Sequence, residues 1–389
     1  MFFTKENITM LLDIYPKQEI LTSVFPSIRC SNDGKNLIGQ TEIENRTVEG
    51  NPLYSIEFVP GYFKIDMFDN KVFRRKIFNS KKGYSICLDG FTSVDNYLKK
   101  QFSNKGKPIK RSVRRLENCL DISYKMYYGE ISRDNYNFLF GLLKEMIEKR
   151  FRQRNEKSHN LGSWDSLFKT GYDLINEKKA SLFVIYHRDN PIEISFNYHY
   201  NRILFSYVSS YSIDYYKFSL GQIEIYKQLE WCFLNKYQYF EMGWGDLEYK
   251  RKWSNNIYTF EHHLVFKKNS IPAYLYVLFE GNKTRLIAYL LAKKINVPYN
   301  KVKGLFKRKQ ATAHNAQKVK LENIEDGNIM NGHSPVTFPD NSTTFLKASF
   351  NSFLYTTQEY YADVQLYHPI ENQYIIQGEN HYQKVILIP

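Results

Sequence analysis

The most reactive side chains of the sequence lie between residues 241 and 250. Two carboxylates, a phenol and an amine occur there: Glu241, Asp246, Tyr249 and Lys250. A carboxylate at a strand end, partly desolvated by Trp244 and Trp253, can take a proton from an ammonium nucleophile. Tyr249 can donate a proton to a leaving group, and Lys250 can hold a phosphate or a carboxylate. The alternative is a structural loop in which Asp246 caps the turn and Lys250 pairs with an acid.

Residues 219–222 form a second candidate site. Ser219, Leu220, Gly221 and Gln222 begin a predicted helix directly after a strand and a loop. The free N–H groups and the dipole of a helix N-terminus favour an anion, and a glycine lets the backbone approach it closely. We therefore expect an anion such as a phosphate at this point. The alternative is an ordinary serine N-cap.

Positive charge is concentrated in two stretches. Residues 99–115 include eight basic residues and no acidic one, and residues 281–321 include eleven and again no acid. Together they exceed the net charge of +14, which indicates anionic partners such as cofactor phosphates, nucleic acid or a membrane surface. On a helix, Arg111, Arg114 and Arg115 fall near one side, which favours contact with an anion. Two solvated helix faces are the alternative.

Several function classes lack their signatures in this sequence. The four cysteines are far apart, and no His, Cys and Asp cluster has the spacing of metal ligands, so we expect no metal. A Walker loop, a Rossmann glycine fingerprint and a nucleophile elbow are absent. The N-terminal segment is a poor signal peptide, and no apolar run approaches the roughly 20 residues that span a bilayer. We therefore expect a cytoplasmic protein.

The candidate groups must be positioned by alternating strands and helices. Apolar spacing predicts helices at 93–102, 109–119, 132–147, 164–178, 219–234 and 271–295, with a break near Gly281 as an alternative in the last. Strands are predicted at 53–59, 62–68, 83–90, 122–128, 181–187, 192–200, 203–211, 237–243, 257–266, 352–369 and 373–389. Loops are predicted at 31–50 and 244–253, and a linker at 310–344.

Three stretches resemble a known family. They are the basic helical element 96–117, the helix and strand at 218–243, and the segment 243–253, which contains a Gly-x-x-x-Tyr-Lys-x-x-Trp sequence. These residues resemble the FemABX-like and CelD-like branch of the GNAT acyltransferase superfamily, over roughly residues 55–268. Leu220 stands where the family often has proline, and Glu241 where it often has aspartate.

The resemblance implies an α+β fold made of two GNAT-like halves, with mixed, mostly antiparallel sheets flanked by helices, and a small C-terminal β-rich extension. We expect the first half at 1–155 and the second half, with the acyl-transfer motifs, at 156–268. A basic amphipathic helical segment is expected at 269–309, and a linker with the β-rich extension at 310–389.

The resemblance also implies an N-acyltransferase that moves an acyl group from acyl-CoA to a small-molecule acceptor. The acceptor is an amine, or a hydroxyl, of a small molecule or amino sugar in cell-surface polysaccharide or lipid assembly. In this interpretation Glu241, Asp246 and Tyr249 are catalytic, and the donor is bound by Ser219, Leu220, Gly221, Gln222, Lys250, Arg111, Arg114 and Arg115.

Two further interpretations stay open. One is a Fem-type ligase that takes its acyl group from aminoacyl-tRNA, and only under this alternative do we expect a nucleic-acid partner. The other is a non-enzymatic binder of nucleic acid or of an anionic membrane. Residues 271–309, within the basic amphipathic segment, are also expected to make peripheral contact with a membrane.

Overall fold

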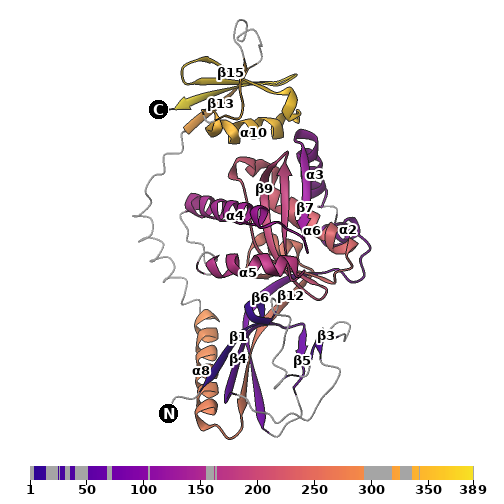
Figure 1. The fold of residues 1–389 in the computed structure, drawn as a ribbon, viewed down its shortest axis with the longest axis vertical. Coiled ribbons are helices and arrows are strands. Elements are labelled where there is room, and N and C mark those ends of the chain that lie inside the picture. Colours follow the sequence, from indigo (N-terminus) through magenta and orange to yellow (C-terminus); the bar gives the residue numbers. More distant parts are fainter. Residues whose placement is uncertain are drawn as a thin grey trace.

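Figure 1 shows the computed structural model of the chain. It describes residues 4–14, 25, 27–30, 36–39, 51–67, 72–103, 106–154, 162, 164–292, 318–324, 335–340 and 342–388. Within them lie a nine-stranded central sheet, a three-stranded sheet and a five-stranded C-terminal sheet.

The central sheet joins both expected halves of the chain. Its strand order is β1-β4-β12-β6-β11-β10-β9-β8-β7. The strands are β1 (Lys5–Thr9), β4 (Leu53–Pro60), β6 (Phe73–Cys87), β7 (Ile122–Tyr127), β8 (Ala180–His187), β9 (Asn190–Tyr200), β10 (Ile203–Tyr211), β11 (Tyr239–Trp244) and β12 (Asn256–Lys267). Neighbours are antiparallel, except that β1 with β4 and β10 with β11 are parallel. A parallel pair needs a crossover, and a helix provides it between β10 and β11.

Helices cover both faces of the sheet. On one face lie α4 (Arg133–Arg154) and α5 (Trp164–Asn176), where Phe140 and Trp164 pack with Phe196 of β9. On the other lie α2 (Val94–Phe102), α3 (Lys107–Cys119) and the crossover helix α6 (Leu220–Leu234). The short helix α7 (Glu248–Trp253) follows β11, and α8 (Ile271–Ala292) packs beside β12 and β6. Two irregular helical turns, η1 (Met10–Ile14) and η3 (Ile213–Phe218), precede β2 and α6.

Two smaller sheets complete the described part of the chain. Strands β2 (Ser27–Cys30), β3 (Asn36–Gly39) and β5 (Phe63–Ile65) form the three-stranded sheet. The C-terminal unit contains β13 (Lys318–Ile324), β14 (Pro335–Val336), β15 (Gln365–Ile370), β16 (Gln373–Gln377) and β17 (Tyr382–Ile388), with η5 (Thr344–Leu346), α10 (Lys347–Thr357) and η6 (Tyr361–Asp363).

The predicted fold class is confirmed: a large mixed sheet flanked by helices, with a separate β-rich unit at the C-terminus. The division at residue 155 stays a prediction. Strands from before it, β4 and β6, alternate in the sheet with β11 and β12 from after it. Helix α8 is continuous through Gly281, so the alternative break is not present there.

Some local predictions are wrong because tertiary pairing overrides local composition. The basic segment 73–82 lacks alternation, yet it extends β6 because β12 pairs with it along most of its length. Strands β3 and β13 lie in segments predicted as loop and linker. The predicted loop 244–253 contains α7. Residues 352–357, predicted as strand for their aromatic content, belong to α10, whose buried Phe350, Phe353 and Leu354 have helical spacing.

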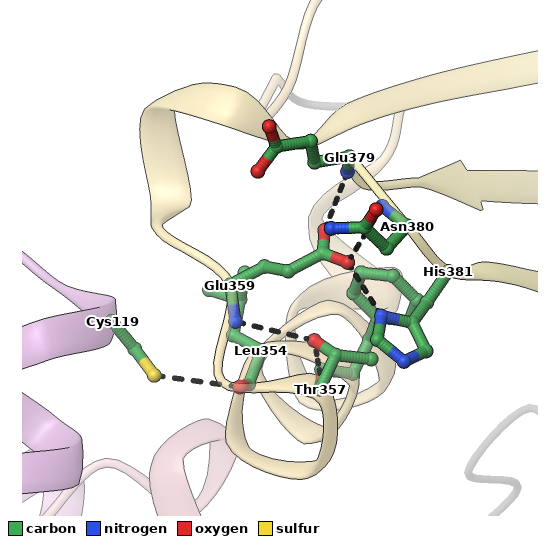
Figure 2. Close-up of polar contacts among 8 residues, drawn as sticks. Cys119, Leu354, Thr357, Glu359, Glu379, Asn380 and His381 are labelled. Carbon is green, nitrogen blue, oxygen red and sulfur yellow. Dashed lines mark hydrogen bonds and ion pairs between the residues drawn. The ribbon is translucent and has the colours of Figure 1, made fainter.

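The C-terminal unit rests on α3 and η3. Sγ of Cys119 contacts the carbonyl of Leu354 over 3.4 Å, as Figure 2 shows, and Nδ2 of Asn351 donates to the carbonyl of Asp214 over 3.1 Å. The Arg115 guanidinium lies 4.5 Å from the centre of the Tyr355 ring. The contact of Asn351 joins the unit to η3, which directly precedes α6. The contacts of Cys119 and Arg115 join it to α3.

Within the C-terminal unit, the carboxylate of Glu359 organises the turn between β16 and β17 (Figure 2). It accepts the backbone N–H of Glu379 over 2.8 Å and that of Asn380 over 3.2 Å, and it pairs with Nδ1 of His381 over 2.7 Å. A side chain at Gly378 would collide with it, since a Cβ there would be 1.4 Å from Oε2 of Glu359.

We predict that Glu359→Ala loosens this turn, because two backbone N–H groups lose their acceptor. The local free energy of opening should fall by about 1–2 kcal/mol. Hydrogen exchange of the amides at 379 and 380, followed by mass spectrometry, measures it. Glu379→Ala is the control, because the exposed Glu379 contributes its backbone and not its carboxylate to these contacts. Equal exchange in the two variants would contradict the role of Glu359.

Candidate functional site

A cavity of about 700 Å³ opens where β10 and β11 separate. The two strands pair only from Ile203 with Tyr239 to Phe205 with Glu241. Beyond this point β10 bulges against β9 and continues to Tyr211 without pairing to β11. Residues of β10, β11, α4, α6 and α7 line the cavity. A strand edge released from its neighbour offers N–H and C=O groups to an extended ligand with amide groups of its own.

Glu224 lines the cavity from the second turn of α6 and is only 5% exposed. Nε2 of Gln228 donates to its Oε1 over 2.7 Å. Burial raises the pKa of Glu224 to about 7, although hydrogen bonds and the charge of Arg150 oppose the rise. A carboxylate with a pKa near neutrality can accept a proton at neutral pH and release it again. Glu224 is therefore a candidate general base.

The face of β9 beneath α6 is polar although it is buried. Four residues alternate there, each at most 1% exposed: Glu193, Ser195, Asn197 and His199. Nε2 of Gln228 also donates to Oγ of Ser195 over 3.3 Å, and that hydroxyl donates to Oδ1 of Asn197 over 3.1 Å. Ser195 and Asn197 therefore fix the amide of Gln228, and that amide in turn fixes the carboxylate of Glu224.

Glu193 is a second buried carboxyl close to the cavity. Both of its oxygens lack a hydrogen-bond partner among the described residues. It pairs in register with Tyr211 of β10, which lines the cavity. Burial raises the pKa of Glu193 well above its ordinary value, and the neighbouring Glu224 raises it further. Burial thus favours the neutral form of Glu193, whereas Glu224 has hydrogen bonds and the charge of Arg150 that favour its ionised form.

The first turn of α6 reaches the cavity as the sequence predicts. Ser219, Gly221 and Gln222 line it, whereas Leu220 is fully buried in the core. The backbone of Ser219 is left-handed, with φ of 61°, and turns the chain sharply into the helix. A Cβ at Gly221 would lie 3.8 Å from the ring of Tyr211.

Arg150 and Arg154 of α4 also line the cavity. The Arg150 guanidinium lies 4.1 Å from the centre of the Tyr211 ring, which is the ring that Gly221 approaches. A cationic side chain and the N-terminus of a 15-residue helix therefore meet at one place. Both features favour an anion such as a phosphate.

Tyr249 and Lys250 of α7 line the cavity too. Lys250 is buried, and its Nζ donates to the carbonyls of Met242 and Trp244, each over 2.6 Å. Burial lowers the pKa of Lys250 to about 8. The ammonium of Lys250 therefore satisfies two backbone carbonyls at the end of β11. Tyr249 is partly exposed and stays available to a ligand.

Glu241 lies at the point where β10 and β11 separate, but it is absent from the cavity lining. Its carboxylate is fully buried and accepts the hydroxyl of Tyr62 over 2.8 Å and the N–H of Gly243 over 2.7 Å. Burial raises the pKa of Glu241 from 4.5 to about 7, against the effect of these hydrogen bonds.

Asp246, the other predicted base, is 62% exposed on its side chain and does not line the cavity. Its carboxylate accepts hydrogen bonds from Tyr84 and from Arg251, and these lower its pKa in that order of importance.

The arginines predicted to bind the donor lie on α3 and are absent from the cavity lining. Arg111 and Arg114 are exposed, and Arg115 packs against Tyr355 of the C-terminal unit. The structure thus brings together part of the predicted site, namely Ser219, Gly221, Gln222, Tyr249 and Lys250, and places the remaining predicted residues elsewhere.

Residues 103–251 match the family model of the acetyltransferase (GNAT) domain. This segment runs from the start of α3 into α7 and includes the parallel pair, its crossover helix and most of the cavity lining. The match covers less than half of the chain, and within that segment it supports a GNAT-like fold.

Solved structures of similar shape include FemX, with 10% identity and a TM-score of 0.39 over 55% of this chain and 72% of FemX. L-PGS from Bacillus licheniformis has 14% identity and a TM-score of 0.36 over 61% of this chain and 73% of that one. A conserved protein of unknown function from Bacteroides thetaiotaomicron has 13% identity and a TM-score of 0.36 over 55% and 70% of the two chains. No curated protein matches this chain.

Sequence reasoning missed Glu224, Glu193 and Arg150. The signal for Glu224 is an acidic residue placed between two apolar ones, Ile223 and Ile225, near the start of its helix. For Glu193, alternation along β9 suggests a polar face in solvent, and only the tertiary packing of α6 buries it. Among the described residues, no group of three or more His, Cys, Asp or Glu side chains is arranged to hold a metal ion.

We predict that Glu241→Gln flattens the pH dependence of folding stability. The folded state holds the Glu241 proton up to about pH 7 and the unfolded state only to about 4.5, so the wild type loses stability as pH rises between these values. The amide keeps both contacts, because its oxygen can accept from Gly243 and its nitrogen can donate to Tyr62. The loss of unfolding free energy across this range should shrink by about 2–3 kcal/mol.

Urea denaturation at a series of pH values measures this change. Glu57→Gln, at an exposed position on β4, is the matched control and should keep the wild-type slope. An unchanged slope in Glu241→Gln would mean that the Glu241 carboxylate is already ionised at low pH.

Proposed function

We propose that this protein is an N-acyltransferase that takes its acyl group from acyl-CoA and transfers it in the cavity between β10 and β11. The observation that carries the proposal is the separation of these parallel strands around a buried carboxylate, Glu224, with the N-terminus of α6 beside them. The match of residues 103–251 to the GNAT domain supports the same reaction class.

The cavity suits each part of such a donor. The diphosphate fits the first turn of α6 together with Arg150 and Arg154, where the positive groups converge. The amide groups of the pantetheine arm fit the edge of β10 from Ser206 onward, which is not paired to β11. The thioester then lies deep in the cavity, toward the point where the strands meet.

The proposed chemistry uses Glu224 as the base. It takes a proton from the ammonium of the acceptor, and the free amine attacks the acyl carbon. A C–N bond forms and the C–S bond breaks. The CoA thiolate takes a proton from Tyr249 or water, and the proton that the nitrogen releases on becoming an amide replaces it. Positioned bases of this kind typically contribute about 10²–10⁴-fold in rate. An amino sugar or similar small amine of cell-surface polysaccharide or lipid assembly is the proposed acceptor class, on the basis of the family resemblance.

Isothermal titration with CoA, followed by mass spectrometry of reactions with acetyl-CoA and a panel of amino sugars and amines, tests the proposal. We expect one CoA per chain and an acceptor whose mass rises by an acetyl group in place of one hydrogen. Aminoacyl-tRNA is tested in parallel. Binding of tRNA without CoA would replace the proposal with the tRNA-dependent alternative, and binding of neither would reject an acyl-transfer role.

We predict that Glu224→Gln lowers kcat by about 10²–10⁴-fold while CoA affinity changes little, because the amide preserves shape but cannot take a proton. In the wild type, kcat should rise with pH through about 7, since the base must be ionised. The variant should lose this rise. Glu230→Gln, on the surface of the same helix and paired with Lys227, is the matched control. Near wild-type kcat in Glu224→Gln would exclude Glu224 as the base.

We further predict that Arg150→Ala weakens CoA binding by about tenfold, the loss of one charge-assisted contact to a phosphate. Arg152→Ala is the control on the same helix, because Arg152 is exposed and does not line the cavity. Titration of an Arg111→Ala, Arg114→Ala double variant decides between the two basic groups. If this variant loses affinity and Arg150→Ala does not, the phosphates bind at α3 as the sequence alone suggests.

A further inference from the structure

Helix α8 exposes an unusual amount of apolar surface. Eight of its large apolar side chains are between 38% and 73% exposed: Ile271, Tyr274, Leu275, Leu278, Phe279, Leu286, Tyr289 and Leu290. We call this set the α8 stripe. A contiguous apolar surface of this kind on a folded domain commonly marks an interaction site.

The stripe follows one side of the helix. Members on successive turns are three or four residues apart, and Leu286 follows Phe279 by seven, which is two turns. These spacings place the members along one face of an α-helix. The opposite face is already packed: Ala273 and Val277 are buried against Leu53, Leu264 and Phe266 of the central sheet. The stripe is therefore a second apolar face, and it is not needed to fix α8 to the domain.

Positive charge accompanies the stripe. At 100° per residue, Lys283 falls at one edge of the stripe, and Arg285 falls within it, between Tyr274 and Leu278. Eleven basic residues and no acidic one lie between Glu280 and Glu322, beginning with these two. Long basic side chains beside an apolar face can reach lipid phosphates while their stems stay in apolar surroundings.

The length and charge of α8 suit a position in the plane of a membrane. None of the helices in the described ranges is long and apolar enough to cross a bilayer. Helix α8 carries Glu280, Lys283 and Arg285 in its middle, and its stripe covers only one side. Figure 1 shows it beside β1 and β4, at the end of the central sheet remote from β7, where none of the other helices drawn in colour lies over it.

We propose that the α8 stripe docks the protein onto a membrane surface that contains anionic phospholipid, with the helix lying in the interface. Apolar side chains enter the region between headgroups and acyl chains, and Lys283 and Arg285 bind lipid phosphates. A second copy of the chain is a poorer occupant. A twofold contact through the stripe would bring Lys283 and Arg285 of both copies into one interface, where like charges repel. This inference does not depend on the proposed acyl transfer.

Flotation of the full chain with vesicles tests the proposal. Phosphatidylcholine vesicles with and without phosphatidylglycerol are compared at low and high salt. We expect flotation with the anionic vesicles, weakening with salt, and little with the neutral ones. The double variant Leu275→Ser, Phe279→Ser should reduce the bound fraction at least about tenfold, since two exposed apolar groups leave the interface.

The matched control is Phe138→Ser, Leu234→Ser, which changes one phenylalanine and one leucine on α4 and α6. These side chains are 57% and 82% exposed, compared with 63% and 58% for Phe279 and Leu275, so both double variants should fold. Arg285→Glu gives a second test that leaves the stripe intact and should weaken binding to anionic vesicles only. The control should float like the wild type.

Other outcomes overturn the proposal. They are absence of flotation in the wild type, equal flotation with neutral vesicles, or wild-type binding by Leu275→Ser, Phe279→Ser. Sedimentation velocity identifies the remaining case, in which the stripe forms a dimer contact. A concentration-dependent dimer that this double variant abolishes, without vesicle binding, would assign the stripe to contacts between copies of the chain. Titration with CoA should be unaffected in every variant, so failure here and failure of the proposed function are distinguishable.

Discussion

The site depends on one short parallel pairing, that of β10 with β11 over three residue pairs. Parallel neighbours need a crossover, and α6 must therefore begin near the end of β10 and return the chain to the start of β11. Because the strands part after Phe205 and Glu241, the helix start lies over the gap between them. The cavity, the anion-binding helix end and the buried Glu224 all follow from this arrangement.

The same crossover sets the electrostatics of the cavity. When α6 covers β9, it buries a row of polar side chains, and removing charged groups from water is costly unless they are neutral or paired. Burial favours the protonated form of Glu193, and it keeps His199 neutral by lowering its pKa to about 3. Glu224 keeps hydrogen bonds and a nearby arginine, so its pKa rises only to about 7. The packing of α6 on β9 therefore both stabilises the fold and sets the pKa of Glu224.

Local patterns predicted most of the fold that surrounds the site. Periodicity located α2 to α6 and β7 to β12, because each has a regular apolar face against the sheet. It failed where long-range pairing decides the structure, as in the basic part of β6. The site was predicted only where a local rule applies. The helix start at Ser219–Gln222 follows from sequence, whereas the separation of Glu241 from the cavity depends on which face of β11 it occupies.

The distribution of charge along the sequence does not by itself locate the phosphate site. The excess of +14 arises from two basic stretches, and the sequence alone favours placing the donor phosphates at the first. In the structure the arginines of that stretch lie on α3, and the cations beside the cavity come from α4, a helix with both acidic and basic residues. A phosphate site needs a few donors that converge on one point, whereas a membrane surface responds to charge summed over a wide area. Lys283 and Arg285, next to the exposed apolar face of α8, have the second geometry, and the pair of Arg150 with the start of α6 has the first.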